Sequence, residues 1–267
     1  MFTLFLDKEE DIEKIFLYST QKLADTNIII EKCSNSIIFR NISSFIFFSS
    51  WLTKLIIDIF EKNLISKIIN KTYCYFEETE RLKISDISSS IIDENLNSKN
   101  DLIFIAIYDY LKSFSEMNLD GFIRFRLKDY LDVLEYLVDL SVNNFIINRE
   151  YDRFINLLVE YVDNKPSKIE QIHLIYLNQE SILLDTNQNL IPIDSNILDA
   201  KYLSDISFSS NDYALNTILK LLPNKLYVHI LDKEDEFINT LRKIFKNRLY
   251  MCKDCNICNF YRLTILK

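Results

Sequence analysis

The middle of the chain has the sequence NLDGFIRFRLKDYLDVLEYLVDLSVNNFIINREYDRFINLLVEYVD over residues 118–163. Gly121 breaks the helical pattern, and apolar residues then return every three or four positions, as on one face of a helix. These residues are Ile123, Leu127, Tyr130, Leu131, Leu134, Leu137 and Val138. A further helix is expected from about residue 144 to residue 162, and Pro166 ends it. We therefore expect Gly121 to open a pair of helices that organises the molecule.

Strand patterns lie on both sides of this helical stretch. Residues 1–40 predict a small β-α-β-β unit, because one capped helical pattern is followed by two short β-branched runs. Beyond residue 168 the period changes to alternation, which is typical of strands with one buried face. The runs 169–177, 181–184 and 190–193 predict an antiparallel meander. The fold class is therefore α+β, with a central helical bundle between two strand-bearing ends.

Three parts of the chain follow from these patterns. We expect an N-terminal β-α-β-β unit at residues 1–40, a helical middle at residues 41–165 and an α+β C-terminal part at residues 166–267. The polar run from Asn164 to Ser167 contains a proline and is the best linker between elements. The alternative is that all three parts form one compact domain.

The composition excludes several classes of enzyme. The chain has one glycine, Gly121, where average usage would give roughly 19. Phosphate loops, dinucleotide fingerprints and nucleophile elbows need several glycines, so none can be present. Two histidines exclude a metal centre with three histidine ligands. No carboxylates are spaced as an acid–base pair, which favours a protein that is not an enzyme; a hydrolase or transferase would need a site formed only in three dimensions.

Charge and hydropathy indicate a cytoplasmic location. The net charge of −8 disfavours nucleic acid as a partner. The N-terminal residues lack the basic and small-residue features of a signal peptide. The most apolar run, Ile42–Thr53, has twelve uncharged residues, whereas a membrane-spanning helix needs about 20. We expect this run to form a buried core helix. Five cysteines, an odd number, without a secretion signal indicate reduced thiols.

The C-terminus carries a motif with metal-ligand spacing, Cys252-Lys-Asp-Cys255-Asn-Ile-Cys258. Two-residue gaps let three thiolates converge on one zinc ion or on an iron–sulfur cluster. A ferredoxin would have its fourth cysteine at position 262, where this chain has arginine. A fourth ligand would come from a distant residue: Cys33, Cys74, His173 or His229. The alternatives are thiol redox chemistry of the Cys-x-x-Cys pairs, or three reduced thiols without a ligand.

A second candidate site lies in the central stretch. Arg124, Arg126 and Lys128 crowd the start of a predicted helix, where positive charge opposes the helix dipole. Neighbouring acids such as Asp132 could compensate this charge. The alternative is a bound anion, since free amides at a helix start and three cations make a site of phosphate size. Gly121, Arg124, Arg126 and Lys128 are therefore candidates for binding an anion or a protein partner.

The central stretch also carries a family resemblance. Its matching residues are Gly121-Phe122, Phe125-Arg126-Leu127-Lys128-x-Tyr130-Leu131, Glu150-Tyr151 and Phe154-Ile155-x-Leu157-Leu158. This pattern resembles the YtxC-like sporulation proteins of endospore-forming bacteria. The resemblance implies a role in spore formation and supplies no activity, substrate or cofactor. We therefore expect a non-enzymatic protein that binds a protein partner or an anionic ligand, with a metal-binding, cluster-binding or thiol redox protein as the alternative.

Overall fold

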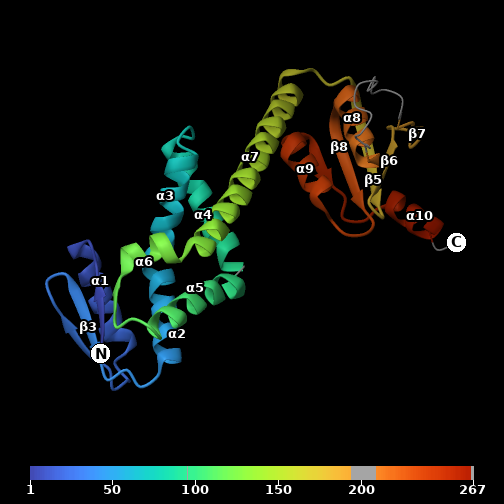
Figure 1. The fold of residues 1–267 in the computed structure, drawn as a ribbon. Coiled ribbons are helices and arrows are strands. Elements are labelled where there is room, and N and C mark those ends of the chain that lie inside the picture. The colour runs from blue at the N-terminus through green and yellow to red at the C-terminus, as the bar shows by residue number, and fades with distance from the viewer. Residues whose placement is uncertain (95, 194–208, 266–267) are drawn as a thin grey trace. The chain divides into compact units, whose positions relative to one another are not determined.

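The computed structural model describes residues 1–94, 96–193 and 209–265 (Figure 1). It has a small N-terminal sheet, a helical middle and a C-terminal sheet, which confirms the α+β class. Contacts within the chain group it into two compact units, residues 1–148 and residues 149–267, which join within helix α7 (Lys128–Asn164). The division at residues 40 and 165 stays a prediction.

The sheet of the first unit has four strands. Its strands are β1 (Phe2–Phe5), β2 (Ile29–Lys32), β3 (Ser36–Arg40) and β4 (Glu116–Asn118), in the order β2-β3-β1-β4. The helix α1 (Glu9–Lys22) lies between β1 and β2, as the β-α-β-β pattern predicts. Strand β4 pairs parallel to β1 and was not expected, because three residues are too few to show alternation.

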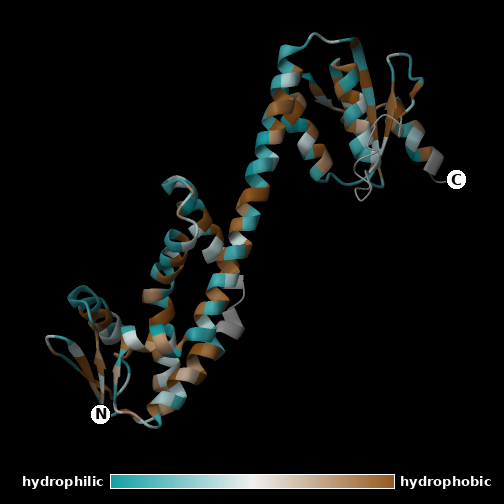
Figure 2. Ribbon diagram, turned by 45° about the horizontal axis from the view of Figure 1, so that its top comes forward, coloured by the Kyte–Doolittle hydropathy of each residue, from teal (hydrophilic) through white to brown (hydrophobic). Residues whose placement is uncertain are grey.

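Helices form the rest of the first unit. They are α2 (Phe45–Ile56), the π-helical segment η1 (Ile57–Glu61), α3 (Lys62–Thr72), α4 (Glu78–Glu94), α5 (Leu96–Leu111), α6 (Leu119–Arg126) and the first part of α7. Helix α2 packs beside α5. Figure 2 shows hydrophobic and hydrophilic residues alternating around these helices, as amphipathic packing requires.

The expectation for the run Ile42–Thr53 is correct only in part. From Phe48 onward most residues of the helix are buried, with Ser50 and Lys54 exposed, and Phe48 stacks on Trp51 with ring centroids 5.2 Å apart. Phe39 of the sheet contacts both rings at 5.3 and 5.1 Å. The first turn, Phe45–Phe47, is exposed instead of buried. A single apolar run cannot show which of its turns meets the core. Among the described residues, no helix is long and apolar enough to span a membrane.

The second unit contains a mixed five-stranded sheet. Its strands are β5 (Ile169–Leu177), β6 (Glu180–Leu184), β7 (Leu190–Ile191), β8 (Pro223–Ile230) and β9 (Leu249–Met251), in the order β7-β6-β5-β8-β9. The three strands β5, β6 and β7 form the expected antiparallel meander. Strands β8 and β9 extend the sheet and run parallel to β5.

The helices that connect the parallel strands make the two faces of this sheet different. They are α8 (Ser210–Leu221), before β8, and α9 (Glu236–Phe245), before the short η2 (Lys246–Arg248) and β9. Crossovers of one hand that move in one direction along a sheet place their helices on one face. That face carries Ile172, Leu174, Leu226 and Val228, which pack in one core with α8, α9 and the end of α7. The intervening residues of β5 and β8 therefore face the other way.

A buried polar contact joins η1 to α7 in the first unit. The Tyr130 hydroxyl donates to Glu61 Oε2 over 2.7 Å, and the two residues are 1 % and 7 % exposed. Burial, and then the Glu61 carboxylate, raise the pKa of Tyr130 far above its usual value, so the hydroxyl stays a donor. The contact fixes the π-helical turn against α7.

Replacing Tyr130 with phenylalanine should destabilise the first unit, because the buried carboxylate loses one donor. A hydrogen bond to a charged group contributes about 1.5–3 kcal/mol, and we expect the free energy of unfolding to fall by that amount. Urea denaturation followed by Trp51 fluorescence measures it. Tyr136→Phe is the matched control, because Tyr136 lies on the same helix and is 61 % exposed. Equal losses in the two variants would contradict the assignment.

Candidate metal centre

Four side chains of the second unit converge at the end of its parallel strands. The ligand atoms of His229, Cys252, Cys255 and Cys258 all lie within 4.8 Å of one another. The Sγ atom of Cys258 is 3.7 Å from that of Cys252 and 3.8 Å from that of Cys255. His229 Nδ1 is 3.3 Å from the Cys258 sulfur and 3.5 Å from the Cys255 sulfur.

Strand register brings the first two of these side chains together. Val228 pairs with Met251 in the parallel β8–β9 ladder, so His229 and Cys252 are the next residues along the two strands. The Cys252 N–H continues the ladder by donating to the Val228 carbonyl over 2.9 Å. Since Val228 belongs to the apolar core, alternation places His229 on the opposite face of the sheet.

The helix α10 (Asn256–Ile265) supplies the other two thiols. Cys255 precedes its first residue, and Cys258 lies in its first turn. Burial raises the pKa of the Cys255 thiol, but hydrogen bonds from the backbone N–H groups of Cys258 and Ile257 and contacts with neighbouring thiols bring it below its usual value. The free amides of a helix start thus favour the thiolate, which is the form that binds metals.

A second histidine lies behind His229. His173 Nδ1 is 2.9 Å from His229 Nε2, and the His173 ring stacks on Tyr227 at a centroid distance of 5.1 Å. Burial, and then the neighbouring His173, lower the pKa of His229 to about 4, and burial lowers that of His173. The His229 imidazole is therefore neutral near pH 7. If Nε2 carries its proton and donates to His173, Nδ1 presents a lone pair to the thiols.

The four atoms fit the corners of a tetrahedron around one ion. Zn–S bonds of about 2.3 Å and Zn–N bonds of about 2.0–2.1 Å give tetrahedral edges of about 3.8 Å between sulfurs and about 3.6 Å from nitrogen to sulfur. Four of the six edges in the structure are close to these lengths, at 3.7 and 3.8 Å between sulfurs and 3.3 and 3.5 Å from nitrogen to sulfur, and all six are within 4.8 Å. In a four-iron cluster each ligand binds a different iron, and in a two-iron cluster the ligands divide between two irons, so four ligands of a cluster do not all stand this close together. The spacing therefore fits a single ion better than a cluster.

Of the four residues named as sources of a fourth ligand, one lies at the three thiols in the structure. His229 completes the set, and only 2 % of its surface is exposed. His173 contacts His229 instead of the thiols. Cys33 and Cys74 are exposed and belong to the first compact unit. Sequence spacing identifies the three cysteines, whereas the choice between the histidines depends on strand register.

Gly121 does not break a helix. It lies inside α6, where its N–H donates to the capping oxygen Asn118 Oδ1 over 2.7 Å, and its φ is not positive. A Cβ at this position would lie 3.0 Å from the same oxygen, which is too close without a shift of the cap. The glycine therefore makes room for the cap of α6.

The three cations of the central stretch do not share one helix start. Arg124 and Arg126 lie in the last turn of α6, where positive charge is favourable, and Lys128 begins α7 after a break at Leu127. The expectation that all three oppose a helix dipole is therefore wrong for the two arginines. Arg124 and Gly121 line a pocket of about 440 Å³, whereas Arg126 and Lys128 do not. Lys67, Asp7 and Asp120 share its lining.

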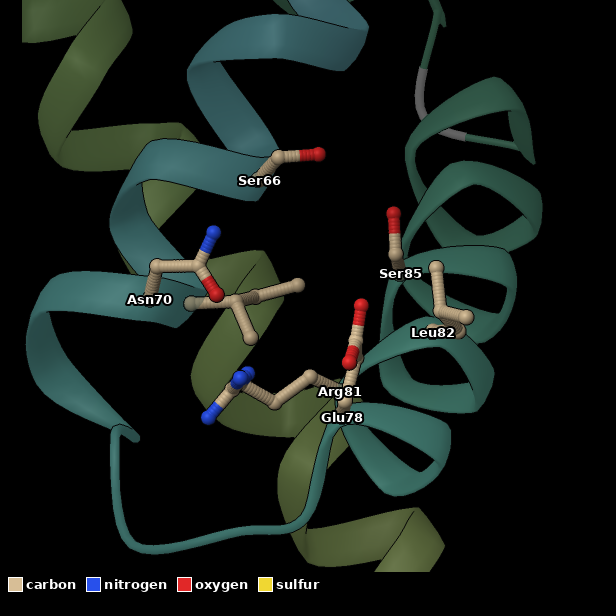
Figure 3. A pocket seen from close by; sticks show the side chains of 7 residues that line it. Ser66, Asn70, Glu78, Arg81, Leu82 and Ser85 are labelled. Atoms are coloured by element: carbon tan, nitrogen blue, oxygen red, sulfur yellow. The ribbon is translucent and has the colours of Figure 1, made fainter.

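A smaller pocket of about 190 Å³ lies between α3 and α4 (Figure 3). In the figure, Ser66 and Asn70 extend from α3, and Glu78, Arg81 and Ser85 extend from the facing helix. The Arg81 guanidinium donates to the backbone carbonyls of Cys74 and Phe76. Its charge therefore holds the loop between the two helices and does not mark a ligand site.

Comparison with known proteins places the chain among relatives without an assigned activity. The model of the YtxC-like family matches residues 46–250. A curated relative, "Uncharacterized protein YtxC" of Bacillus subtilis (strain 168), is 26 % identical over 137 residues, which are 47 % of this chain and 48 % of that protein. The match thus spans about half the length of that relative. No solved structure matches the chain. The family match includes His173 and His229 and ends before Cys252.

The convergence of the sulfurs can be tested without a metal. When the reduced, metal-free chain is treated with diamide, we expect disulfides among Cys252, Cys255 and Cys258, because their sulfurs are adjacent. Cys33 and Cys74 should remain alkylatable. Peptide mass mapping after alkylation gives the pairing, and oxidation in urea serves as the control with scrambled pairs. A native product linked mainly through Cys33 or Cys74 would contradict the geometry.

Proposed function

Since the chain belongs to the YtxC-like family, we propose that it is a non-enzymatic binding protein of spore formation whose second unit holds one zinc ion. The ligands are His229, Cys252, Cys255 and Cys258. The observation that supports the zinc site is the convergence, within 4.8 Å, of four ligand atoms that come from a strand, a strand end and a helix start.

The ligand set supports a structural ion. Three thiolates and one imidazole fill the four positions that zinc uses, so no position is left for water or substrate. The ion would link the edge of the sheet to α10. Thiolates need a reducing environment to stay free of disulfides, which is consistent with the proposed cytoplasmic location.

We expect the protein, purified under reducing conditions without chelator, to carry one zinc ion per chain by elemental analysis. Cys255→Ser and Cys258→Ser should lose the ion, because each removes a ligand. Cys33→Ser and Cys74→Ser are matched controls that should retain it, since both residues are exposed and outside the cluster.

The same assay tests the role of His173. His173→Phe removes the group that contacts His229 Nε2, and the loss of such a partner typically weakens metal affinity 10–100-fold. Stoichiometry at saturating zinc should stay at one. Protein with no metal and five freely reacting thiols would contradict the zinc proposal. Iron with sulfide would favour the cluster alternative, and a reversible disulfide without metal would favour the thiol redox alternative.

The pocket beside α6 is a second candidate, for an anionic ligand or an acidic segment of a partner. Its support is that Arg124 and Lys67 line the same cavity of about 440 Å³ as Gly121, where the two carboxylates of the lining accept hydrogen bonds, Asp7 from Asn118 and Asp120 from the Asp7 N–H. Neither cation makes an ion pair within the described part of the chain. Arg126 and Lys128 are exposed and would add positive potential outside the cavity.

We expect Arg124→Gln to lower spore yield when it replaces the native copy in an endospore-forming host, because it removes a charge from this cavity. Arg126→Gln should have a smaller effect, since that residue does not line the cavity. Equal protein levels and circular dichroism spectra are the control. A wild-type spore yield in the Arg124 variant would contradict the proposal that this cavity is a binding site.

A further inference from the structure

The first unit has another pocket, between α1 and α2, that shares no residue with the candidate sites above. Its volume is about 220 Å³. The residues that the argument uses are Tyr18, Lys22, Phe47, Trp51, Lys54 and Asp58. The lining therefore combines two cations, one carboxylate and aromatic side chains.

The net charge of this pocket is positive, because two lysines and one carboxylate line it, and the Lys22 ammonium lies 5.9 Å from the centre of the Tyr18 ring. The only carboxylate of its lining, Asp58, accepts a hydrogen bond from the Tyr18 hydroxyl over 2.7 Å. Lys22 and Lys54 form no ion pair with any described residue. Lys54 and Asp58 are four positions apart, a spacing that favours pairing in an α-helix. Here the π-helical η1 begins at Ile57, between them, and the two do not pair.

The Trp51 ring belongs to the same lining and is 6 % exposed. Its Nε1 has no acceptor in the described structure and is closed to solvent, so a ligand in the pocket would contact the ring and not this nitrogen. Asp58 of the lining belongs to the π-helical η1, and π-helical turns are frequent at functional sites.

The walls of the pocket indicate what else the ligand contains. Phe47 is 46 % exposed beside the two lysines, although it belongs to the most apolar run of the chain. An aromatic ring is best covered by another flat apolar group. The volume suits a molecule with one ring and a short charged substituent.

We propose that this pocket binds a small aromatic carboxylate. The carboxylate faces the ammonium groups of Lys22 and Lys54, and the ring lies against Phe47. Each part of the ligand thus meets one feature of the lining.

Trp51 is the only tryptophan of the chain, so its fluorescence reports on this pocket directly. Benzoate is titrated into the full chain at constant ionic strength, with excitation at a wavelength that benzoate does not absorb. We expect a saturable change in emission. Benzamide, which has the ring without the charge, and inorganic phosphate, which has the charge without the ring, should each bind at least tenfold more weakly.

Variants locate the site. The double variant Lys22→Gln/Lys54→Gln should weaken benzoate binding at least tenfold, and Lys14→Gln/Lys62→Gln is the matched control on α1 and α3 that should not. A non-saturable wild-type titration would overturn the proposal, as would benzamide or phosphate binding as tightly as benzoate. The wild-type comparison of the three probes decides the question even if a variant fails to fold. Neither the comparison of the three probes nor the comparison of the variants involves the zinc ligands, so both results are independent of the proposed function.

Discussion

Parallel pairing of β8 with β9 is the constraint on which the second unit depends. It places His229 beside Cys252 and starts α10 where two more thiols reach the same point. Three thiolates packed this closely carry a cost, and burial raises the pKa values of Cys252 and Cys258 above their usual range. Thiolates repel one another, and burial penalises each of them. A divalent cation would offset both penalties, which supports the metal that we propose there.

The sequence reveals those parts of this site whose residues are close together along the chain. The three cysteines lie within seven residues, so their convergence follows from local turns and is visible in the spacing. His229 reaches them through a strand register that joins residues more than twenty positions apart, and both histidines lie in similar strand patterns. Nothing in those patterns distinguishes the residue at the cluster from His173 behind it. The meander β5-β6-β7 was predictable because its pairs are adjacent in sequence, whereas the parallel pairing of β8 with β5 and β9 joins distant segments of the chain.

In the first unit, the regular spacing of apolar residues hides the break between α6 and α7. The apolar stripe from Ile123 to Val138 continues through Leu127, because that residue is buried on the same side as its neighbours even though α6 ends there. A continuous stripe therefore cannot reveal that one helix has become two. The break reverses the electrostatic argument for Arg124 and Arg126, which lie at a favourable helix end. It also explains why Gly121 serves the cap of α6 and not a turn.

The two edges of the C-terminal sheet have a further consequence. Its outer strands are short, with two residues in β7 and three in β9. Long exposed edge strands invite strand addition from other chains and thereby aggregation, and short ones blunt this risk. The β9 edge ends directly in the cysteine turn, so the segment that gathers the thiols also stops the ladder. Isoleucine, phenylalanine and tyrosine favour β-strands, and this chain is rich in them. The same turn therefore limits β-pairing between chains.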